Sequence, residues 1–181
     1  MFSKDGVDEL LMTLDKFCTT IYATGGTYKY IAESNYKNPL IKVEDITGYP
    51  SILGGRVKTL HPKVFGGILN RRNFESDIND VAQYEIPAID MVIVDLYPFE
   101  KTVESGSPEE DIIEKIDIGG VSLIRAAAKN FEDVLIVSSV EQLPSVTQYL
   151  AENEGCTSLE MRRKMAAMAF SVTSHYDTAI F

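Results

Sequence analysis

The sequence predicts an α/β fold in which helices cover both faces of a mostly parallel sheet. Two short apolar runs, residues 91–94 and 134–137, are typical of strands that are buried on both faces. Helical patterns lie between such runs, and this alternation favours layers of helix, sheet and helix. With 181 residues and 45% hydrophobic content, the chain is long enough for one domain with a real core.

The N-terminal part predicts a helix, a strand and a second helix. Helical spacing over residues 7–17 is given by the apolar residues Val7, Leu10, Leu11 and Leu14. A β-like run, Ile21-Tyr22-Ala23, then stops at the turn Thr24-Gly25-Gly26-Thr27. We expect the second helix over about residues 28–34.

Three further helices are predicted from their starts. Ser107-Pro108-Glu109-Glu110 has Ser107 as a candidate N-cap, and the inner face of this helix would be Ile112, Ile113 and Ile116. Asp117 occupies a cap position before the apolar stretch 123–128. Thr157-Ser158-Leu159-Glu160 is a capping box for a last helix. One face of this helix carries an apolar stripe that we interpret as core or an interface, formed by Met161, Met165, Met168 and Val172.

Composition excludes several classes of function. The net charge of −10 argues against a nucleic-acid-binding surface. No apolar run approaches the roughly 20 residues that span a bilayer, and the N-terminus lacks the pattern of a signal peptide. Cys18 and Cys156 form no metal-binding spacing, so we expect two reduced, buried or half-buried thiols in a cytoplasmic protein.

The loop of residues 54–62 is the strongest candidate for chemistry. Two glycines precede Arg56, Lys58 and Thr59, and Pro62 is suited to the first turn of a helix. A planar guanidinium fork and a point charge suit one phosphate group. The alternative is a solvated, charged surface loop. His61, next to a proline, is interpreted as a structural residue.

Polar residues also follow two of the predicted strands. Thr24-Gly25-Gly26-Thr27 comes after one strand and Asp95-Leu96-Tyr97-Pro98-Phe99 after another. Ligands of parallel α/β sheets bind beyond the carboxyl ends of the strands, so we expect both segments, and the 54–62 loop, at one edge. Backbone N–H groups and hydroxyls of the first segment suit phosphate, although taken alone the segment slightly favours an ordinary glycine turn with a threonine cap.

Asp117-Ile118-Gly119-Gly120 has two interpretations. The simple one is an N-cap and a helix start. The functional one is that the glycines free backbone N–H groups for developing negative charge, with Asp117 beside the reacting atoms. Lys129 ends the same helix, where the helix dipole is a sufficient explanation for a lysine.

The order of these motifs, together with Arg125-Ala126-Ala127-Ala128-Lys129-Asn130, resembles the inosine monophosphate (IMP) cyclohydrolase domain of the bifunctional purine-biosynthesis protein. The resemblance covers nearly the whole chain, from Ser3-Lys4-Asp5-Gly6 to the capping box. It implies a methylglyoxal-synthase-like α/β/α sandwich with a mostly parallel sheet.

The resemblance also implies a reaction. The carboxamide nitrogen of 5-formamidoimidazole-4-carboxamide ribonucleotide attacks the neighbouring formyl carbon, and water leaves to give IMP, without a cofactor or a metal. A base, an acid and donors for the formyl oxygen are required. The implied catalytic residues are Lys129, Lys58, Tyr97 and Asp117, with the division of acid and base between Lys58 and Lys129 left open.

The implied substrate-binding residues fall into two groups. The phosphate would meet Ser3, Lys4, Thr24, Gly25, Gly26, Thr27, Arg56 and Thr59, and Val57 of the same loop is also a substrate-binding residue. The base and the oxyanion would meet Val94, Asp95, Ile118, Gly119 and Gly120. The chain departs from the family pattern at Phe2, where many relatives have Ser, and at Asp95, where many have Asn.

We therefore expect residues 1–181 to be a single IMP cyclohydrolase domain with a truncated N-terminal strand and without the formyltransferase domain, and we favour an excised fragment. The expected partner is a small purine nucleotide, with neither nucleic acid nor membrane, and a homodimer is left open. Two alternatives remain: a regulatory nucleotide-binding module and a methylglyoxal-synthase-like lyase.

Overall fold

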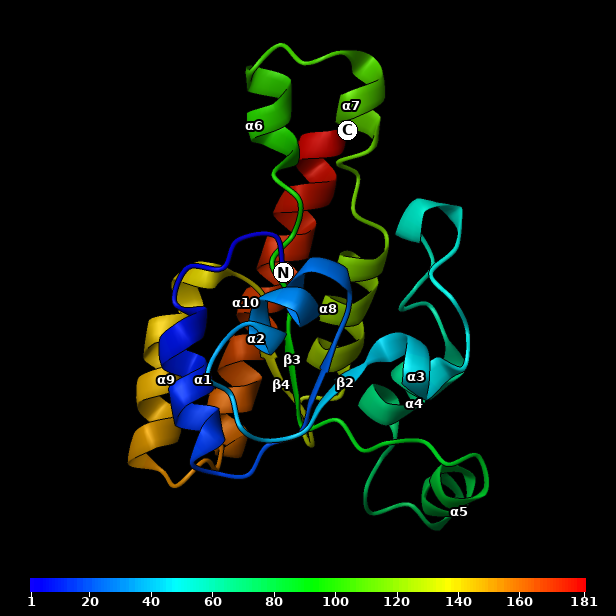
Figure 1. Ribbon diagram of the computed structural model, residues 1–181, viewed down its shortest axis with the longest axis vertical. Helices are drawn as coiled ribbons and strands as arrows, with labels where there is room; N and C mark the ends of the chain where they lie inside the picture. Colours follow the sequence, from blue (N-terminus) through cyan, green and yellow to red (C-terminus); the bar gives the residue numbers. More distant parts are fainter.

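The computed structural model describes residues 1–181, in which strands and helices alternate as predicted (Figure 1). In chain order the elements are α1 (Val7–Asp15), β1 (Ile21–Ala23), α2 (Gly25–Ala32), β2 (Leu40–Lys42), α3 (Val43–Thr47), a 3-10 turn (Leu53–Gly55), α4 (Pro62–Leu69), α5 (Glu75–Gln83), β3 (Met91–Ile93), α6 (Phe99–Glu104), α7 (Glu109–Ile113), α8 (Gly119–Lys129), β4 (Leu135–Val137), a second 3-10 turn (Val140–Gln142), α9 (Leu143–Glu152) and α10 (Leu159–Ile180).

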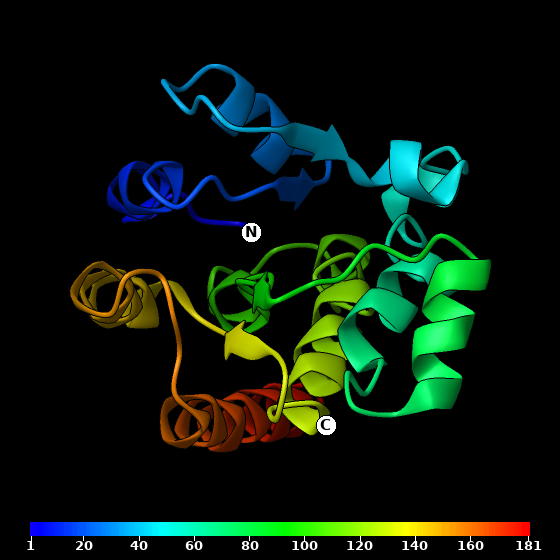
Figure 2. The ribbon, with the colours of Figure 1, turned by 90° about the horizontal axis from the view of Figure 1, so that it is seen from below.

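All strand pairs are parallel, as predicted. Ile21 of β1 lies opposite Leu40 of β2, and Met91 of β3 lies opposite Leu135 of β4. No hydrogen bonds join β1 to β3, so the layer consists of two two-stranded pairs rather than the single sheet that we expected. Figure 2 shows the two pairs in one layer, with the N-terminus between them.

Helices cover both faces of this layer, which confirms the predicted architecture. α1 packs against α9 on one side, while α4 packs against α8 on the other (Figure 2). The long helix α10 lies against α8 and β4. The core is deepest at β4 and the helices beside it, where Ile124, Ile136 and Leu143 are fully buried. Truncation of such a residue to alanine typically costs about 2–5 kcal/mol.

The predicted start at Ser107 is wrong in detail. Pro108 precedes α7 without a capping hydrogen bond, and the Ser107 hydroxyl instead lies 2.9 Å from that of Ser105. Ile113, expected on an inner face, is 51% exposed. The physical reason is that α6 and α7 project from the body beside the end of α10, so α7 has little core to face (Figure 1).

The start of α10 is confirmed, but its buried face differs from the predicted stripe. Ser158 is the N-cap, and its side chain accepts the N–H of Met161 at 3.1 Å. The buried side chains are Met165, Ala166, Ala169, Thr173 and Tyr176. Met168 is 40% exposed, because the face toward α8 and β4 is rotated from the methionine stripe.

Both cysteines differ from expectation in burial. Cys18 and Cys156 are free, but both are exposed rather than buried or half-buried. They lie in the connections that follow α1 and α9, outside the core. No helix of the chain combines the length and the apolar composition needed to cross a bilayer.

Candidate active site

The turn after β1 forms the N-terminus of α2, as its position after a strand suggested. Thr24 is the N-cap residue in an extended conformation, and its side chain makes no capping hydrogen bond. The first N–H groups of a helix have no partner within the helix, and with the helix dipole they favour an anion. An added Cβ at Gly26 would meet nothing within 4 Å, so the turn is open on this side.

Lys58 reaches from the 54–62 loop to this helix start. A Cβ atom added at Gly25 would lie 3.9 Å from the Lys58 Nζ, and one added at Gly55 would lie 3.6 Å from it. Gly55 has a φ of +89°, a conformation that favours glycine. The Lys58 ammonium group therefore lies between two glycine-containing turns, at the predicted edge of the strand layer.

Asp117 and the start of α8 lie beside this cation. The Asp117 Oδ1 accepts the N–H of Gly120 at 2.6 Å. A Cβ at Gly120 would lie 2.5–2.9 Å from the Asp117 carboxyl group, so only glycine fits here. The Thr59 Oγ1 would lie 3.0 Å from a Cβ at Gly119, which places the loop of Lys58 directly against the start of α8.

The environment of Asp117 changes its acidity. Burial raises the pKa of the Asp117 carboxyl group above its ordinary value. The N–H groups of Gly120 and Tyr97, the N-terminal ammonium group and Lys58 oppose this rise. Two of these opposing groups, the Tyr97 N–H and the Lys58 ammonium group, belong to residues that the resemblance names as catalytic. The fold therefore brings Lys58, Tyr97 and Asp117 together.

Tyr97 lies on the open side of the cluster. The residue is 39% exposed, and its ring makes an edge contact with Phe2, with the ring centroids 6.1 Å apart. The Lys115 ammonium group lies 5.7 Å from the centroid of the Tyr97 ring. Phe2, one of the two departures from the family pattern, thus contributes an apolar contact to Tyr97 in place of a hydroxyl.

The N-terminal segment crosses from the end of β1 to the end of β3. The Met1 amine is 3.2 Å from the Thr27 Oγ1, and the backbone N–H of Ser3 donates to the Asp95 carboxylate at 2.7 Å. The Lys4 Nζ donates to the Met1 carbonyl at 2.6 Å, and burial lowers the pKa of Lys4. Asp95, the second departure, therefore acts here as an acceptor.

Other predicted binding residues lie around this cluster with less defined roles. The Ser3 hydroxyl donates a hydrogen bond to the Asp5 carboxylate at 2.9 Å, so it is already paired within the chain. Val57 is half-buried, and Val94 is buried with its N–H donated to the Val137 carbonyl. The Ile118 side chain is 58% exposed, so it is accessible to a ligand above the start of α8.

Arg56 is paired with a residue that the sequence analysis did not single out. Its guanidinium group forms an ion pair with Glu114, and both side chains are more than half exposed. Exposed ion pairs contribute little stability, typically about 0–1 kcal/mol, so this pair is easily exchanged. A phosphate group would compete with Glu114 for Arg56.

Lys129 does not join the cluster within one chain. It is the last residue of α8, and Gly119 is the first of its 11 residues, which separates the two along the helix axis by about 15 Å. Lys129 also precedes β4, whereas Tyr97 follows β3, so the two lie at opposite edges of the strand layer. The Lys129 residue is exposed.

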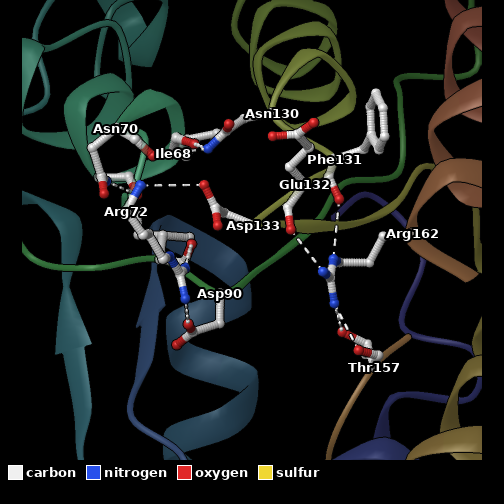
Figure 3. A network of polar contacts seen from close by, with 12 residues as sticks. Ile68, Asn70, Arg72, Asp90, Asn130, Phe131, Glu132, Asp133, Thr157 and Arg162 are labelled. Carbon is white, nitrogen blue, oxygen red and sulfur yellow. Dashed lines mark hydrogen bonds and ion pairs between the residues drawn. The ribbon is translucent and has the colours of Figure 1, made fainter. Parts of the chain in front are cut away.

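The neighbourhood of Lys129 is a network of structural contacts (Figure 3). The Asn130 amide donates to the carbonyls of Ile68 at 2.8 Å and Asn70 at 3.0 Å. Arg162 donates to the Phe131 carbonyl at 3.0 Å and to the Glu132 carbonyl at 2.6 Å. These bonds fasten the connection from α8 to β4 against α4 and α10.

His61 has the structural role that we predicted. It is the N-cap of α4, and its Nδ1 accepts the N–H of Lys63 at 3.1 Å. Pro62 occupies the first turn, as expected. No three His, Cys, Asp or Glu side chains converge in a way that could hold a metal ion.

A cavity of about 300 Å³ lies on the α10 side of Asp95. Half of its lining residues bear a hydroxyl group, and the lining consists of Asp95, Leu96, Ser138, Ser139, Ser171, Val172, His175 and Tyr176. Asp95 is its one residue from the predicted set. The convergence of charged groups, rather than this hollow, therefore marks the candidate site.

Sequence reasoning missed three residues that contact the site: Glu114, Lys115 and Tyr176. Glu114 and Lys115 resemble any solvated charges before a glycine turn. Tyr176 lies 59 residues from Asp117, yet its hydroxyl oxygen accepts the Asp117 N–H at 3.0 Å. Pairing over such a separation leaves no local pattern in the sequence.

Comparison with known proteins supports the motif resemblance. Residues 6–122 match the model of the MGS-like domain family, and residues 127–181 match that of the AICARFT/IMPCHase bienzyme family. The chain is 58% identical over its full length to the bifunctional purine biosynthesis protein PurH of Bacteroides thetaiotaomicron, and 45% identical over 98% of its length to PurH of Bradyrhizobium diazoefficiens. It spans 35% and 33% of these relatives, about a third of their length.

A solved structure agrees with this assignment. The crystal structure of ForH is similar to the chain with a TM-score of 0.80 and 34% identity, and the match covers 99% of this chain and 93% of ForH. One family model thus covers most of the chain, and the fold of a homologous structure follows almost all of it. The chain therefore belongs to the MGS-like domain family, in the group that contains the PurH proteins.

Proposed function

We propose that the chain is an IMP cyclohydrolase that closes the purine ring in purine biosynthesis. The observation that carries the proposal is the meeting of Lys58, Tyr97 and Asp117 beside the N-terminus of α2. A regulatory module would need the phosphate-binding turn, but it would have no need for a half-buried carboxylate with a raised pKa beside a cation. The PurH relatives and the AICARFT/IMPCHase match support the same chemistry.

In the proposed reaction the carboxamide nitrogen forms a bond to the formyl carbon and loses one proton. The formamido nitrogen loses a second proton as it forms a double bond to the same carbon, and the formyl oxygen takes up two protons and leaves as water. Asp117 is suited to accept the proton, because its raised pKa makes the carboxylate a stronger base. The N–H groups of Ile118 and Gly119 make no hydrogen bond within the chain and would hold the formyl oxygen. The N–H of Gly120, a third predicted donor, is already used by Asp117.

Lys58 and Tyr97 would complete the site. The Lys58 ammonium group lies near both the α2 turn and Asp117, so it would balance charge between the phosphate and the closing ring. The Tyr97 hydroxyl would supply a proton donor on the open side. Thr24, Thr27, Arg56 and Thr59 would bind the phosphate, with Arg56 released from Glu114.

Lys129 has the catalytic role implied by the resemblance only if the C-terminal end of α8 reaches Lys58, Tyr97 and Asp117. Within one chain it does not reach them. Lys129→Ala separates the two cases. A loss of turnover would require a second copy of the chain or a rearrangement to bring Lys129 to the ring. Parental turnover would confine proton transfer to Lys58, Tyr97 and Asp117.

The test is an absorbance assay of ring closure on the chain itself. The proposal predicts IMP formation from the formamido nucleotide, and its loss in Asp117→Asn. Tight IMP binding without turnover would favour the regulatory module. Conversion of dihydroxyacetone phosphate would favour the lyase.

A further inference from the structure

We propose that Tyr176 is a positioning residue for Asp117, an inference that rests on the proposed function. Tyr176 belongs to α10 and is only 8% exposed. Its hydroxyl oxygen accepts the backbone N–H of Asp117 at 3.0 Å, and its hydroxyl hydrogen is donated to the Lys115 carbonyl. One buried hydroxyl therefore bonds both ends of the Lys115–Asp117 segment.

This segment needs such a support. Residues 115–117 lie between α7 and α8, so no helical ladder fixes the Asp117 peptide. The Asp117 side chain is fixed at the other end by the N–H of Gly120. Tyr176 and Gly120 together thus set the position of the carboxylate, one through the backbone and one through the side chain.

Tyr176 also links Asp117 to the segment that carries Tyr97. The Tyr176 ring makes an edge contact with Phe99, with the centroids 6.4 Å apart, and Phe99 is 8% exposed. The ammonium group of Lys115, whose carbonyl is held by Tyr176, lies over the Tyr97 ring. Tyr176 therefore contacts both the segment that carries Tyr97 and the segment that carries Asp117, without itself lying in the 54–62 loop.

Tyr176→Phe tests the role, because it removes the hydroxyl and keeps the ring against Phe99. We expect kcat for ring closure to fall roughly 10- to 100-fold, as for a small displacement of a reacting group, while KM changes less than about threefold. Carbon-13 NMR titration of the Asp117 carboxyl group gives a second measurement. Its raised pKa should move down toward that of an ordinary aspartate, because a released segment exposes the carboxylate to water.

Tyr36→Phe is the matched control. The Tyr36 hydroxyl also donates to a backbone carbonyl, that of Thr19, in a half-buried setting far from Asp117. We expect a comparable loss of thermal stability, with parental kcat and an unchanged Asp117 pKa. If both variants lose kcat equally, a general loss of stability explains the effect and the proposal is wrong.

The outcomes separate this inference from the proposed function. If the parent closes no ring, the proposed function fails, and the Asp117 titration alone decides the role of Tyr176. If Tyr176→Phe does not fold, Tyr176→p-aminophenylalanine carries the test, since it keeps a donor for Lys115 and weakens the acceptor for Asp117. Parental kcat together with an unshifted Asp117 pKa would overturn the proposal.

Discussion

Asp117→Asn is the substitution that most sharply separates chemistry from binding. Asparagine is nearly isosteric, and its Oδ1 can still accept the Gly120 N–H that lies 2.6 Å from the carboxylate in the parent. What is lost is the proton acceptor. A positioned general base contributes typically about 10²–10⁴-fold, which corresponds to about 2.7–5.4 kcal/mol of transition-state stabilisation. We expect kcat to decrease by a factor within this range. KM should change little, because the residues proposed to bind the phosphate are unchanged.

The assay is initial-rate absorbance of ring closure at several substrate concentrations, with IMP binding measured separately. Asp15→Asn is the control, because Asp15 also accepts hydrogen bonds, from the Lys37 N–H at 2.9 Å and the Asn38 amide at 2.8 Å, but outside the cluster. Its kcat should equal that of the parent. A kcat for Asp117→Asn within about threefold of the parent would refute the role of Asp117 as the base.

The titration of Asp117 and the contacts of Gly120, Arg56 and Asn130 can each be tested by substitution. Because the pKa of Asp117 is raised in the folded state, that state holds the proton more tightly than the unfolded state does. The free energy of unfolding therefore falls as the pH rises from the unfolded pKa through the folded pKa. In urea unfolding at about pH 4 and about pH 7, Asp117→Asn should gain stability relative to the parent at the higher pH. Gly120→Ala, whose Cβ would lie 2.5–2.9 Å from the Asp117 carboxyl group, should lower both kcat and the melting temperature, whereas Gly26→Ala, with open space, should lower the melting temperature far less. Arg56→Ala should raise KM for the nucleotide roughly 10-fold or more, whereas Glu114→Ala, which only frees Arg56, should leave KM equal or lower; equal KM in all three proteins would contradict a phosphate role for Arg56. Asn130→Ala should cost about 1–3 kcal/mol of unfolding free energy by leaving two carbonyls without their donor, with unchanged kcat, and a lost kcat would place this end of α8 in the site.

Much of the candidate site could be predicted because its parts are local. The glycine turn after β1, the start of α4 at Pro62 and the bond from the Gly120 N–H to Asp117 depend on residues a few positions apart. Pro62 lies where its pattern indicated, whereas α2 begins three residues earlier than predicted and the N-cap of α8 is Ile118 rather than Asp117. Ligands of parallel α/β sheets bind beyond the carboxyl ends of the strands, and this regularity predicted that these segments lie at one edge of the strand layer.

The remaining features depend on packing between distant segments. The buried face of α10 is set by α8 and β4, so the methionine stripe did not reveal it. Tyr176 and Glu114 gain their roles through partners 58 or more residues away. The β2 strand, Leu40–Lys42, was not predicted, because its residues are only half-buried or exposed and its place is set by parallel pairing with β1.

Lys129 shows that the order of motifs along the sequence does not by itself place a residue in space. The sequence already places it at the end of the helix that Gly119 begins, and 11 helical residues separate the two ends by about 15 Å. Sequence order joined Lys129 to the other three residues, although helix geometry in one chain keeps it apart from them.

The most direct test of the account is ring closure by the chain under single-turnover conditions, with Asp117→Asn measured beside it. We expect the parent to convert the bound formamido nucleotide to IMP, and Asp117→Asn to bind the nucleotide normally but convert it at least about 100-fold more slowly. Tight nucleotide binding by both proteins, with conversion by neither, would contradict the account and leave a nucleotide-binding module in its place.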